Sequence, residues 1–322
     1  MTPSSLRPLQ WAAVAAAAMT LMSPAGAQEA YPSRVVELIT PYAAGGGVSA
    51  IARVYAAEAS KVTNQQWVVL NKEGAGGVVG FTAMARAKPD GYTVGFAPAS
   101  PMTNSPFVNA KMPFTNDQIE PVCQVFENVF AVAVKDSSPI KSLPELIALA
   151  KSKPGAISYG HAGPASVPHL SIAAIEKSSG IKFNGIPYRG DGPVLTDVMG
   201  GSIDFAVPAI SSLAGKNLRV LAVLSEKKHP AMPDAPIITQ FGYPAISPGL
   251  NGVYAPAGTP KPVLAELEAI CKKVVASPSF AQGISGLLQT PQYLSAKQFK
   301  ARIQTTYKVH AELVPGLNIE KN

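Results

Sequence analysis

The sequence predicts an α/β protein built on largely parallel sheets. Short apolar runs of strand type alternate with helical segments along most of the chain, and this alternation is typical of parallel strands covered by helices. Glycine-rich turns follow several of these runs, and α/β sheets place their ligand sites at such positions. The chain has 322 residues, a length that suits two domains.

The predicted strands are short apolar runs bounded by turn residues, as in VVELIT, which ends at Thr40. In chain order they cover residues 35–40, 67–70, 93–96, 122–134, 157–159, 183–187, 203–207 and 220–224. The predicted helices show apolar residues at helical spacing, and one of them opens with Leu143-Pro144-Glu145. They cover residues 48–63, 78–87, 143–150, 168–178, 192–199, 261–276 and 296–313.

The first 27 residues predict a secretory signal peptide. Arg7 supplies a positive charge, residues 11–22 form an apolar core, and Ala25-Gly26-Ala27 is a small-residue cleavage site. We therefore expect cleavage before Gln28, export and, in a bacterium, a periplasmic location. The apolar core is too short for a membrane anchor, and no later stretch approaches a membrane span.

Residues 40–49 read TPYAAGGGVS and connect the first predicted strand to the first predicted helix. Glycines let backbone N–H groups approach a ligand, and the start of a helix adds unpaired donors with a partial positive charge. This segment predicts a site for a carboxylate or a phosphate. A tight turn without a ligand is the alternative.

Composition excludes several other classes of function. The formal charge is +7, but Lys and Arg are scattered, and their densest cluster, residues 226–229, is no nucleic-acid-binding arm. The spacing of the histidines and cysteines fits no metal or haem site. Cys123 and Cys271 could form a disulfide after export or remain two buried thiols, and both alternatives stay open.

Several blocks of sequence, taken in order, resemble one family over almost the whole chain after residue 27. They are YPSR at 31–34, PYAAGGG at 41–47, NKEGAGG at 71–77, AKPDGYT at 87–93, SLPEL at 142–146, AKSKPG at 150–155, PYRG at 187–190, LTDVMGG at 195–201 and APAGTPKP at 255–262. Together they are similar to the extracytoplasmic solute receptors of tripartite tricarboxylate transporters, the Bug receptor family.

This resemblance implies a two-lobed periplasmic binding protein of type II, a Venus flytrap. Lobe 1 would hold residues 28–128 and 249–322, lobe 2 would hold residues 129–248, and the crossovers would lie near 130–134 and 249–254. A small carboxylate-bearing solute would bind between the lobes, which close over it. The closed receptor would then deliver it to membrane permease subunits. We expect a monomer, with no catalysis, no cofactor, no metal and no nucleic acid.

The resemblance also implies which residues contact the ligand. In lobe 1 these are Pro41, Tyr42, Ala43, Ala44, Gly45, Gly46, Ser49, Gly74, Ala75, Gly76, Ala99 and Ser100. In lobe 2 they are His161, Gly163, Ser166, Val167, Tyr188, Gly190 and Asp191. The Ser166 hydroxyl and the Val167 N–H are candidate donors at a helix start. His161 would be either a pH-sensitive donor or exposed, and His169 is expected to be structural.

Three departures from the family pattern bear on the ligand. Ser49 stands where the family has Asp, Pro208-Ala209 replace Asp-Asn, and Pro164 and Pro168 replace residues with a backbone donor. These changes remove two acids and two donors, so the pocket should have less capacity for an ammonium group. We therefore expect an aromatic or other weakly polar carboxylate rather than an amino acid.

Three other functions compete with this prediction. A dinucleotide enzyme is disfavoured because residues 74–80 read G-x-G-x-x-x-G rather than G-x-G-x-x-G, without an acid about 20 residues on. A secreted hydrolase is disfavoured because neither G-x-S-x-G nor H-E-x-x-H occurs. An extracytoplasmic sensor that signals rather than transports would have the same sequence features, so it remains an alternative.

Overall fold

A computed structural model describes residues 31–317 and residue 319. The chain divides into two compact units, residues 1–33 and residues 34–322, and every element below belongs to the second. The predicted signal peptide and its cleavage site before Gln28 lie outside the described residues.

Six strands form the first sheet, in the spatial order β11-β4-β10-β3-β1-β2. They are β1 (Val36–Thr40), β2 (Trp67–Asn71), β3 (Thr93–Pro98), β4 (Ile119–Asn128), β10 (Gly249–Pro256) and β11 (Leu294–Ser295). β1 pairs in parallel with β2 and β3, whereas β10 runs antiparallel to both β3 and β4. Val36 and Leu38 on β1 are fully buried because helices cover both faces of this sheet.

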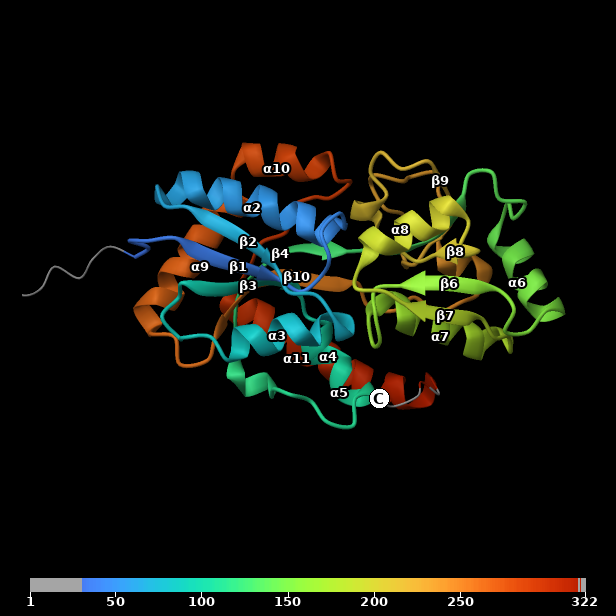
Figure 1. Cartoon of the computed structure of the whole chain (residues 1–322), viewed down its shortest axis with the longest axis horizontal. Helices are drawn as coiled ribbons and strands as arrows, with labels where there is room; N and C mark the ends of the chain where they lie inside the picture. The colour runs from blue at the N-terminus through green and yellow to red at the C-terminus, as the bar shows by residue number, and fades with distance from the viewer. Residues whose placement is uncertain (1–30, 318, 320–322) are drawn as a thin grey trace, which may run out of the picture. The chain divides into compact units, whose positions relative to one another are not determined.

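Helices cover the first sheet from two sides (Figure 1). One face carries α2 (Gly47–Thr63), α9 (Lys261–Val275) and α10 (Pro278–Ser285). The other carries α3 (Val78–Ala85), α4 (Ser100–Thr103) and α11 (Ala296–Leu313), and α5 (Ser105–Val108) follows α4. On the α2 face, the Tyr55 ring packs against the rings of Trp67, Phe96 and Phe280, with centroid separations of 5.3 to 6.2 Å.

Five strands form the second sheet, in the order β7-β6-β8-β5-β9. They are β5 (Ala131–Lys135), β6 (Ser158–His161), β7 (Asn184–Pro187), β8 (Phe205–Ala206) and β9 (Leu218–Val223). β6 runs parallel to β7 and β8, and β5 runs antiparallel to β8 and β9. The chain reaches this sheet after Asn128 and returns to the first sheet at Gly249.

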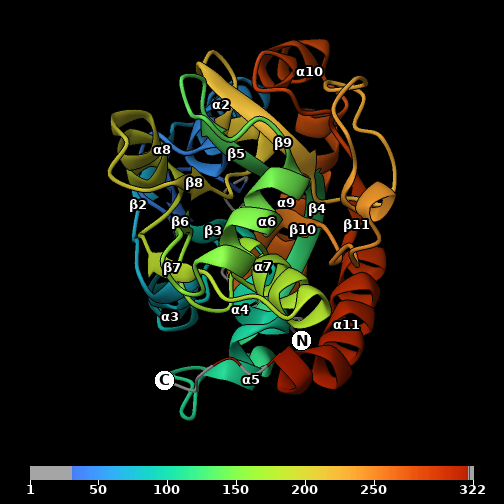
Figure 2. The same cartoon turned by 90° about the vertical axis from the view of Figure 1, so that its right-hand side faces the viewer.

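Three helices flank the second sheet, namely α6 (Leu143–Ser152), α7 (Val167–Ser179) and α8 (Asp191–Gly200). Figure 2 shows α6 and α7 together on the side facing the viewer. Leu143 and Leu170 from these two helices share one buried core, whereas Val194 and Val198 of α8 pack with Ala206 in another. The remaining elements are the 3-10 helices η1 (Ala75–Gly77), η2 (Asn116–Gln118), η3 (Ile210–Ser212), η4 (Ile238–Phe241) and η5 (Val314–Leu317). Two sheets with separate helical layers define a two-lobed α/β fold.

Local sequence explains where helices start. Ser142 caps α6 by accepting the Glu145 N–H at 3.3 Å, and Glu145 in turn accepts the Lys141 N–H at 2.7 Å. Ser295 and Gln298 form a reciprocal capping box at the start of α11. Such caps replace the backbone partners that the first turn of a helix lacks.

Cys123 of β4 and Cys271 of α9 form a disulfide, with their Cα atoms 6.6 Å apart. The sequence left this pairing open. The bond fastens α9 to the first sheet and joins two parts of the chain that are 148 positions apart.

The structure contains elements that the sequence analysis did not predict. The short helices α4 and α5, the helix α10 and the strand β11 fall into this group, and β10 occupies the stretch expected to be a crossover. The predicted strand 203–207 reduces to Phe205–Ala206; Pro208, which follows it, cannot donate a backbone hydrogen bond to a neighbouring strand. None of the helices in the described part of the chain combines the length and apolar character that membrane crossing requires.

Candidate functional site

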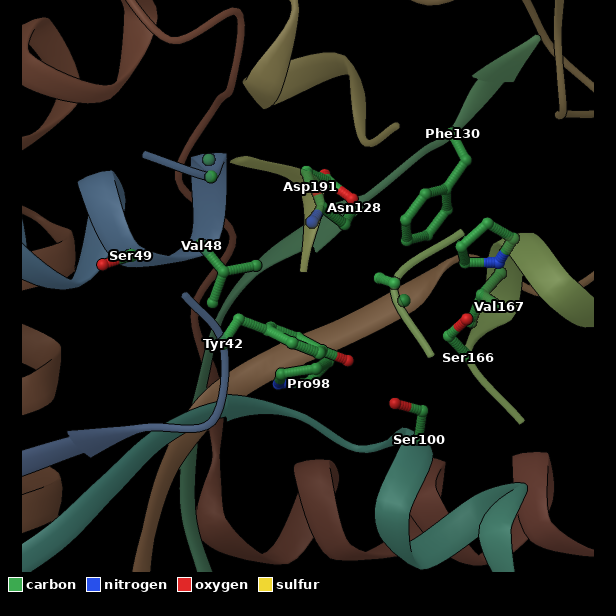
Figure 3. A pocket seen from close by; sticks show the side chains of 15 residues that line it. Tyr42, Val48, Ser49, Pro98, Ser100, Asn128, Phe130, Ser166, Val167 and Asp191 are labelled. Atoms are coloured by element: carbon green, nitrogen blue, oxygen red, sulfur yellow. The ribbon is translucent and has the colours of Figure 1, made fainter. Parts of the chain in front are cut away.

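The loops that follow four strands meet at one place between the two lobes. In the first lobe, β1 leads to α2 and β3 leads to α4, whereas in the second lobe β6 leads to α7 and β7 leads to α8. Ligand sites of α/β proteins lie where strands end and helices begin. Figure 3 shows side chains from both lobes pointing into this region.

A small cavity lies where these loops meet. Residues of both lobes line it, namely Tyr42, Gly46, Gly47, Val48, Ser49, Pro98, Ser100, Asn128, Phe130, Ala162, Ser166, Val167, Pro168, Asp191 and Gly249. Its volume of about 30 Å³ is room for roughly two water molecules. An organic acid therefore needs the lobes to move apart, or the lining side chains to shift, before it can enter.

The backbones of the two lobes touch beside the cavity. The Ala43 N–H donates to the Arg189 carbonyl oxygen at 2.9 Å. A Cβ atom at Gly192 would lie 2.6 Å from the Ala44 carbonyl oxygen, and one at Gly76 would overlap the carbonyl oxygen of Pro164. Glycine is needed at both positions because the opposite lobe leaves no room for a side chain. The described conformation is therefore a closed one.

The start of α2 is joined to the second lobe by a chain of hydrogen bonds. The Gly47 N–H donates to Ser212 Oγ at 2.8 Å, and Ser212 Oγ donates to Asp191 Oδ2 at 2.7 Å. The Ala209 N–H also donates to Asp191 Oδ2, at 2.9 Å. The glycine loop thus meets a carboxylate of the protein itself, through one serine hydroxyl.

Burial dominates the electrostatics of the cavity. It raises the pKa of Asp191, and the hydrogen bonds from Ser212 and Ala209 oppose this shift. Burial also raises the pKa of Tyr42 to about 12. A hydrogen bond with Ser100 opposes this rise, and the negative charge of Asp191 adds to it. Among the described residues that line the cavity, none is a lysine or an arginine. An anion here would depend on backbone N–H and hydroxyl donors.

Two histidines stack beneath one loop of the site. The rings of His161 and His169 have centroids 4.4 Å apart and planes inclined by 13°. His161 Nδ1 lies 2.9 Å from the Gly163 carbonyl oxygen, and His169 Nδ1 accepts the Ala165 N–H at 3.2 Å. Burial lowers the pKa of His161 to about 3 and that of His169 to about 4. Both imidazoles are therefore neutral near pH 7 and support the loop.

A second polar contact joins the lobes away from the cavity. Asn104 Nδ2 donates to the Ala165 carbonyl oxygen at 2.9 Å, while Asn104 Oδ1 lies 2.6 Å from His310 Nδ1 and accepts from the Thr103 hydroxyl at 2.8 Å. All of these side chains are buried. This contact holds the loop before α7 against the first lobe.

The predicted site residues take three kinds of position. Those that line the cavity are Tyr42, Gly46, Ser49, Ser100, Ser166, Val167 and Asp191. A second group lies with its backbone close to the opposite lobe, and it consists of Ala43, Ala44, Gly45, Gly76, Gly163 and Gly190. The others do not line the cavity, and they are Pro41, Gly74, Ala75, Ala99, His161 and Tyr188. His161 is 4% exposed, so the alternative of an exposed side chain is wrong.

Hydroxyl groups at the site already have partners. The Ser166 hydroxyl donates to the Gly163 carbonyl oxygen at 2.6 Å. Ser49 Oγ accepts from Arg53 Nη1 at 2.6 Å and from Asn71 Nδ2 at 2.9 Å. In this conformation the Ser166 hydrogen is therefore directed at the protein, and Ser49 has its acceptor capacity used.

Sequence reasoning missed several residues at the cavity. Asn128 and Phe130, which line the cavity, lie where the chain leaves the first sheet. Ser212 on η3 does not line the cavity but donates a hydrogen bond to Asp191, which does. No glycine pattern or helix start marks these positions. The Pro208-Ala209 departure had drawn attention to this loop, but only as a loss of polar groups. Among the described residues, no cluster of three or more His, Cys, Asp or Glu side chains is placed to hold a metal ion.

Two mixed sheets, a closed pair of lobes and a cavity between them define a periplasmic binding protein fold. A sequence model described as "Tripartite tricarboxylate transporter family receptor" (TctC) matches residues 51–319. The chain therefore belongs to the family of tripartite tricarboxylate transporter receptors.

Individual relatives agree with this assignment. BugT of Bordetella pertussis is 30% identical over 275 residues, which cover 82% of this chain and 84% of BugT. A Pseudomonas sp. (strain P51) protein of the tcbD-tcbE intergenic region is 30% identical over 286 residues, covering 86% of this chain and 84% of that protein. The solved periplasmic binding protein BugD is 28% identical, with a TM-score of 0.86 over 91% of this chain and 100% of BugD.

Proposed function

We propose that this protein is a periplasmic receptor that captures a small carboxylate-bearing solute between its lobes. It would deliver the solute to the membrane permease of a tripartite tricarboxylate-type transporter. It would act as a monomer without catalysis, after export directed by residues 1–27. The family supports this role, and the observation that carries it is the cavity lined from both lobes, whose glycine loops touch across it.

The lobes of the proposal are residues 28–128 with 249–322, and residues 129–248. The change of sheet after Asn128 and the return at Gly249 support these bounds. One solved structure of the same fold contains adipate and another contains malate, at 23% and 24% identity. At this identity the likeness concerns the fold, so the solute of this chain has to be argued from its own cavity.

The proposed solute is a carboxylate with an apolar, preferably aromatic, body. Tyr42, Val48, Pro98, Phe130 and Val167 supply apolar surface to the cavity. The first turn of α2 supplies the N–H groups of Val48 and Ser49. These N–H groups have no acceptor within the helix, because the carbonyl groups four residues earlier lie outside it. A carboxylate at these donors would also be favoured by the helix dipole.

A thermal-shift screen of residues 28–322 against di- and tricarboxylates, amino acids and aromatic acids tests the proposal. A ligand at 100 times its dissociation constant should add about 2.7 kcal/mol to the free energy of unfolding. A shift with aromatic acids supports the full proposal. A shift only with aspartate or glutamate would contradict the aromatic preference, and no shift with any acid would contradict carboxylate capture.

A further inference from the structure

Asp191 is the acidic residue among the described residues that line the cavity. It is the first residue of α8, and only 9% of its surface is exposed. Both of its hydrogen bonds, from the Ala209 N–H and the Ser212 hydroxyl, reach Oδ2. Neither bond occupies Oδ1, so this oxygen remains available to a group in the cavity.

The groups that face Asp191 come from three elements. The loop before α2 brings the Tyr42 hydroxyl, whose pKa responds to the Asp191 charge. The start of α2 brings Gly46, where a Cβ atom would lie 3.6 Å from Asp191 Cβ, and the η3 segment brings Ser212. No lysine or arginine is among the described lining residues, so no cation there neutralises the carboxylate.

A solute carboxylate at the first turn of α2 would enter the same small cavity as Asp191. Two carboxylates close together in a buried site repel each other unless a hydrogen lies between them. A buried acceptor that meets no donor also costs free energy when water is excluded. Closure over the solute therefore favours a solute that brings a donor to Oδ1.

We propose that Asp191 determines specificity by accepting a hydrogen bond from a hydroxyl group on the solute, so that the receptor prefers hydroxy acids over the corresponding acids without the hydroxyl. This inference rests on the proposed function, and it names the substituent that the captured carboxylate carries. The hydroxyl would lie beside the carboxylate, between the start of α2 and the start of α8.

The number of acceptors favours a hydroxyl over an ammonium group. An ammonium brings three donors, whereas a hydroxyl brings one. Ser49 Oγ already accepts from Arg53 and Asn71, and Asn128 Oδ1 already accepts from Ser211 and Gln289, whereas Asp191 Oδ1 is open to a donor on the solute. An ammonium would need two further acceptors when the lobes close, whereas one hydroxyl is satisfied by Asp191 Oδ1 alone.

Isothermal titration of residues 28–322 with matched acids tests the inference. The aromatic set is mandelate, phenylacetate and phenylglycine, and the aliphatic set is malate, succinate and aspartate. We expect the hydroxy acid of the set that binds to exceed its unsubstituted partner by about tenfold or more in affinity. In Asp191→Asn, an amide that can place a donor toward the cavity, the ratio should fall to near one.

Asp117→Asn supplies the matched control, because it makes the same change of charge at an exposed residue of η2. It should keep the wild-type ratio. Each ratio is measured within one variant, so an inactive fraction cancels. Should Asp191→Asn fail to fold, a wild-type ratio near one would still overturn the inference, and Asp191→Glu, which keeps the carboxylate but moves it, should lower the ratio.

Equal affinity for an acid and its hydroxylated partner would overturn the inference, as would a hydroxyl preference that survives in Asp191→Asn. A preference for the amino acid would overturn the choice of a hydroxyl. Binding of no acid at all is a different result, because it contradicts the proposed function and removes the inference with it.

Discussion

Replacing Gly47 with alanine should keep the lobes from closing while leaving the first lobe intact. A Cβ atom at this position would lie 2.6 Å from Ser211 Cβ and 2.8 Å from the Ser211 carbonyl carbon. Rotation of the serine side chain relieves neither contact. Ordinary contact begins near 3.4 Å, so Ser211 and its backbone would have to retreat by about 0.8 Å to relieve the closer of the two contacts. The Gly47 N–H bond to Ser212, 2.8 Å in length, would be strained by this displacement.

Overpacking of this kind costs about 1–3 kcal/mol. Because the clash exists only between closed lobes, the cost falls on ligand binding, and the dissociation constant should rise roughly 5- to 150-fold. Alanine is favoured over glycine within a helix by about 1 kcal/mol, so the melting temperature without ligand should not fall through α2 itself.

The assay is isothermal titration with the acid that the thermal-shift screen selects, alongside thermal melting without ligand. Gly286→Ala is the control, because its Cβ atom would meet nothing closer than the Gly283 carbonyl oxygen at 3.8 Å. A Gly47→Ala dissociation constant within twofold of the wild type would refute the reasoning. It would mean that the ligand-bound lobes are not packed as described.

Three further predictions concern stability. Replacing Cys123 and Cys271 together by alanine should lower the free energy of unfolding by about 2–5 kcal/mol, because the bond spans 148 positions; an unchanged urea midpoint would contradict this. Asn104→Ala should cost about 1–3 kcal/mol, since it leaves the Ala165 carbonyl and His310 without their partner, and urea unfolding measures it against Asn109→Ala. The pKa values of His161 and His169 lie at about 3 and about 4 in the folded protein, below the ordinary 6.5. The unfolded chain therefore binds more protons between pH 6.5 and 4, so the free energy of unfolding should decrease as the pH is lowered through this window, by up to about 1.4 kcal/mol per pH unit for each imidazole. His161→Gln should make this decrease less steep, and an unaltered slope would exclude His161 as its source.

The sequence predicted those elements whose pattern is decided locally. The apolar run ending at Thr40 became β1, and the helical pattern after it became α2. The antiparallel direction of β10 was not predictable, because Gly249–Pro256 pairs with β3 and β4, which lie more than a hundred positions earlier. The disulfide was open for the same reason, since only the fold decides whether Cys123 and Cys271 approach each other.

The same distinction between local pattern and long-range packing applies to the residues of the candidate site. Glycine-rich loops and helix starts are visible in sequence, and they led to Tyr42, Gly46 and Val167 at the cavity. Phe130 and Ser212 lie in segments without such a pattern, and they reach the site because the chain changes sheet there or turns beside Asp191. The polarity argument was incomplete because it counted the acids absent from the family pattern and did not weigh Asp191, although Asp191 was itself among the predicted site residues.

The glycine loops themselves need two separate explanations. An anion cradle requires glycine where backbone N–H groups approach a ligand, but Gly76 and Gly192 are constrained by carbonyl groups of the opposite lobe. The Gly47 N–H already donates to Ser212, so it is not a free donor in the closed form. Glycine at these positions is therefore explained by closure, whereas the proposed anion binding would use the N–H groups of Val48 and Ser49, which residues of other types would also supply. Gly47→Ala separates the two roles, because it adds only a methyl group and keeps every N–H of the helix start. Loss of binding in this variant would show that close contact between the lobes, rather than the glycine backbone as a donor, is what the loop sequence protects.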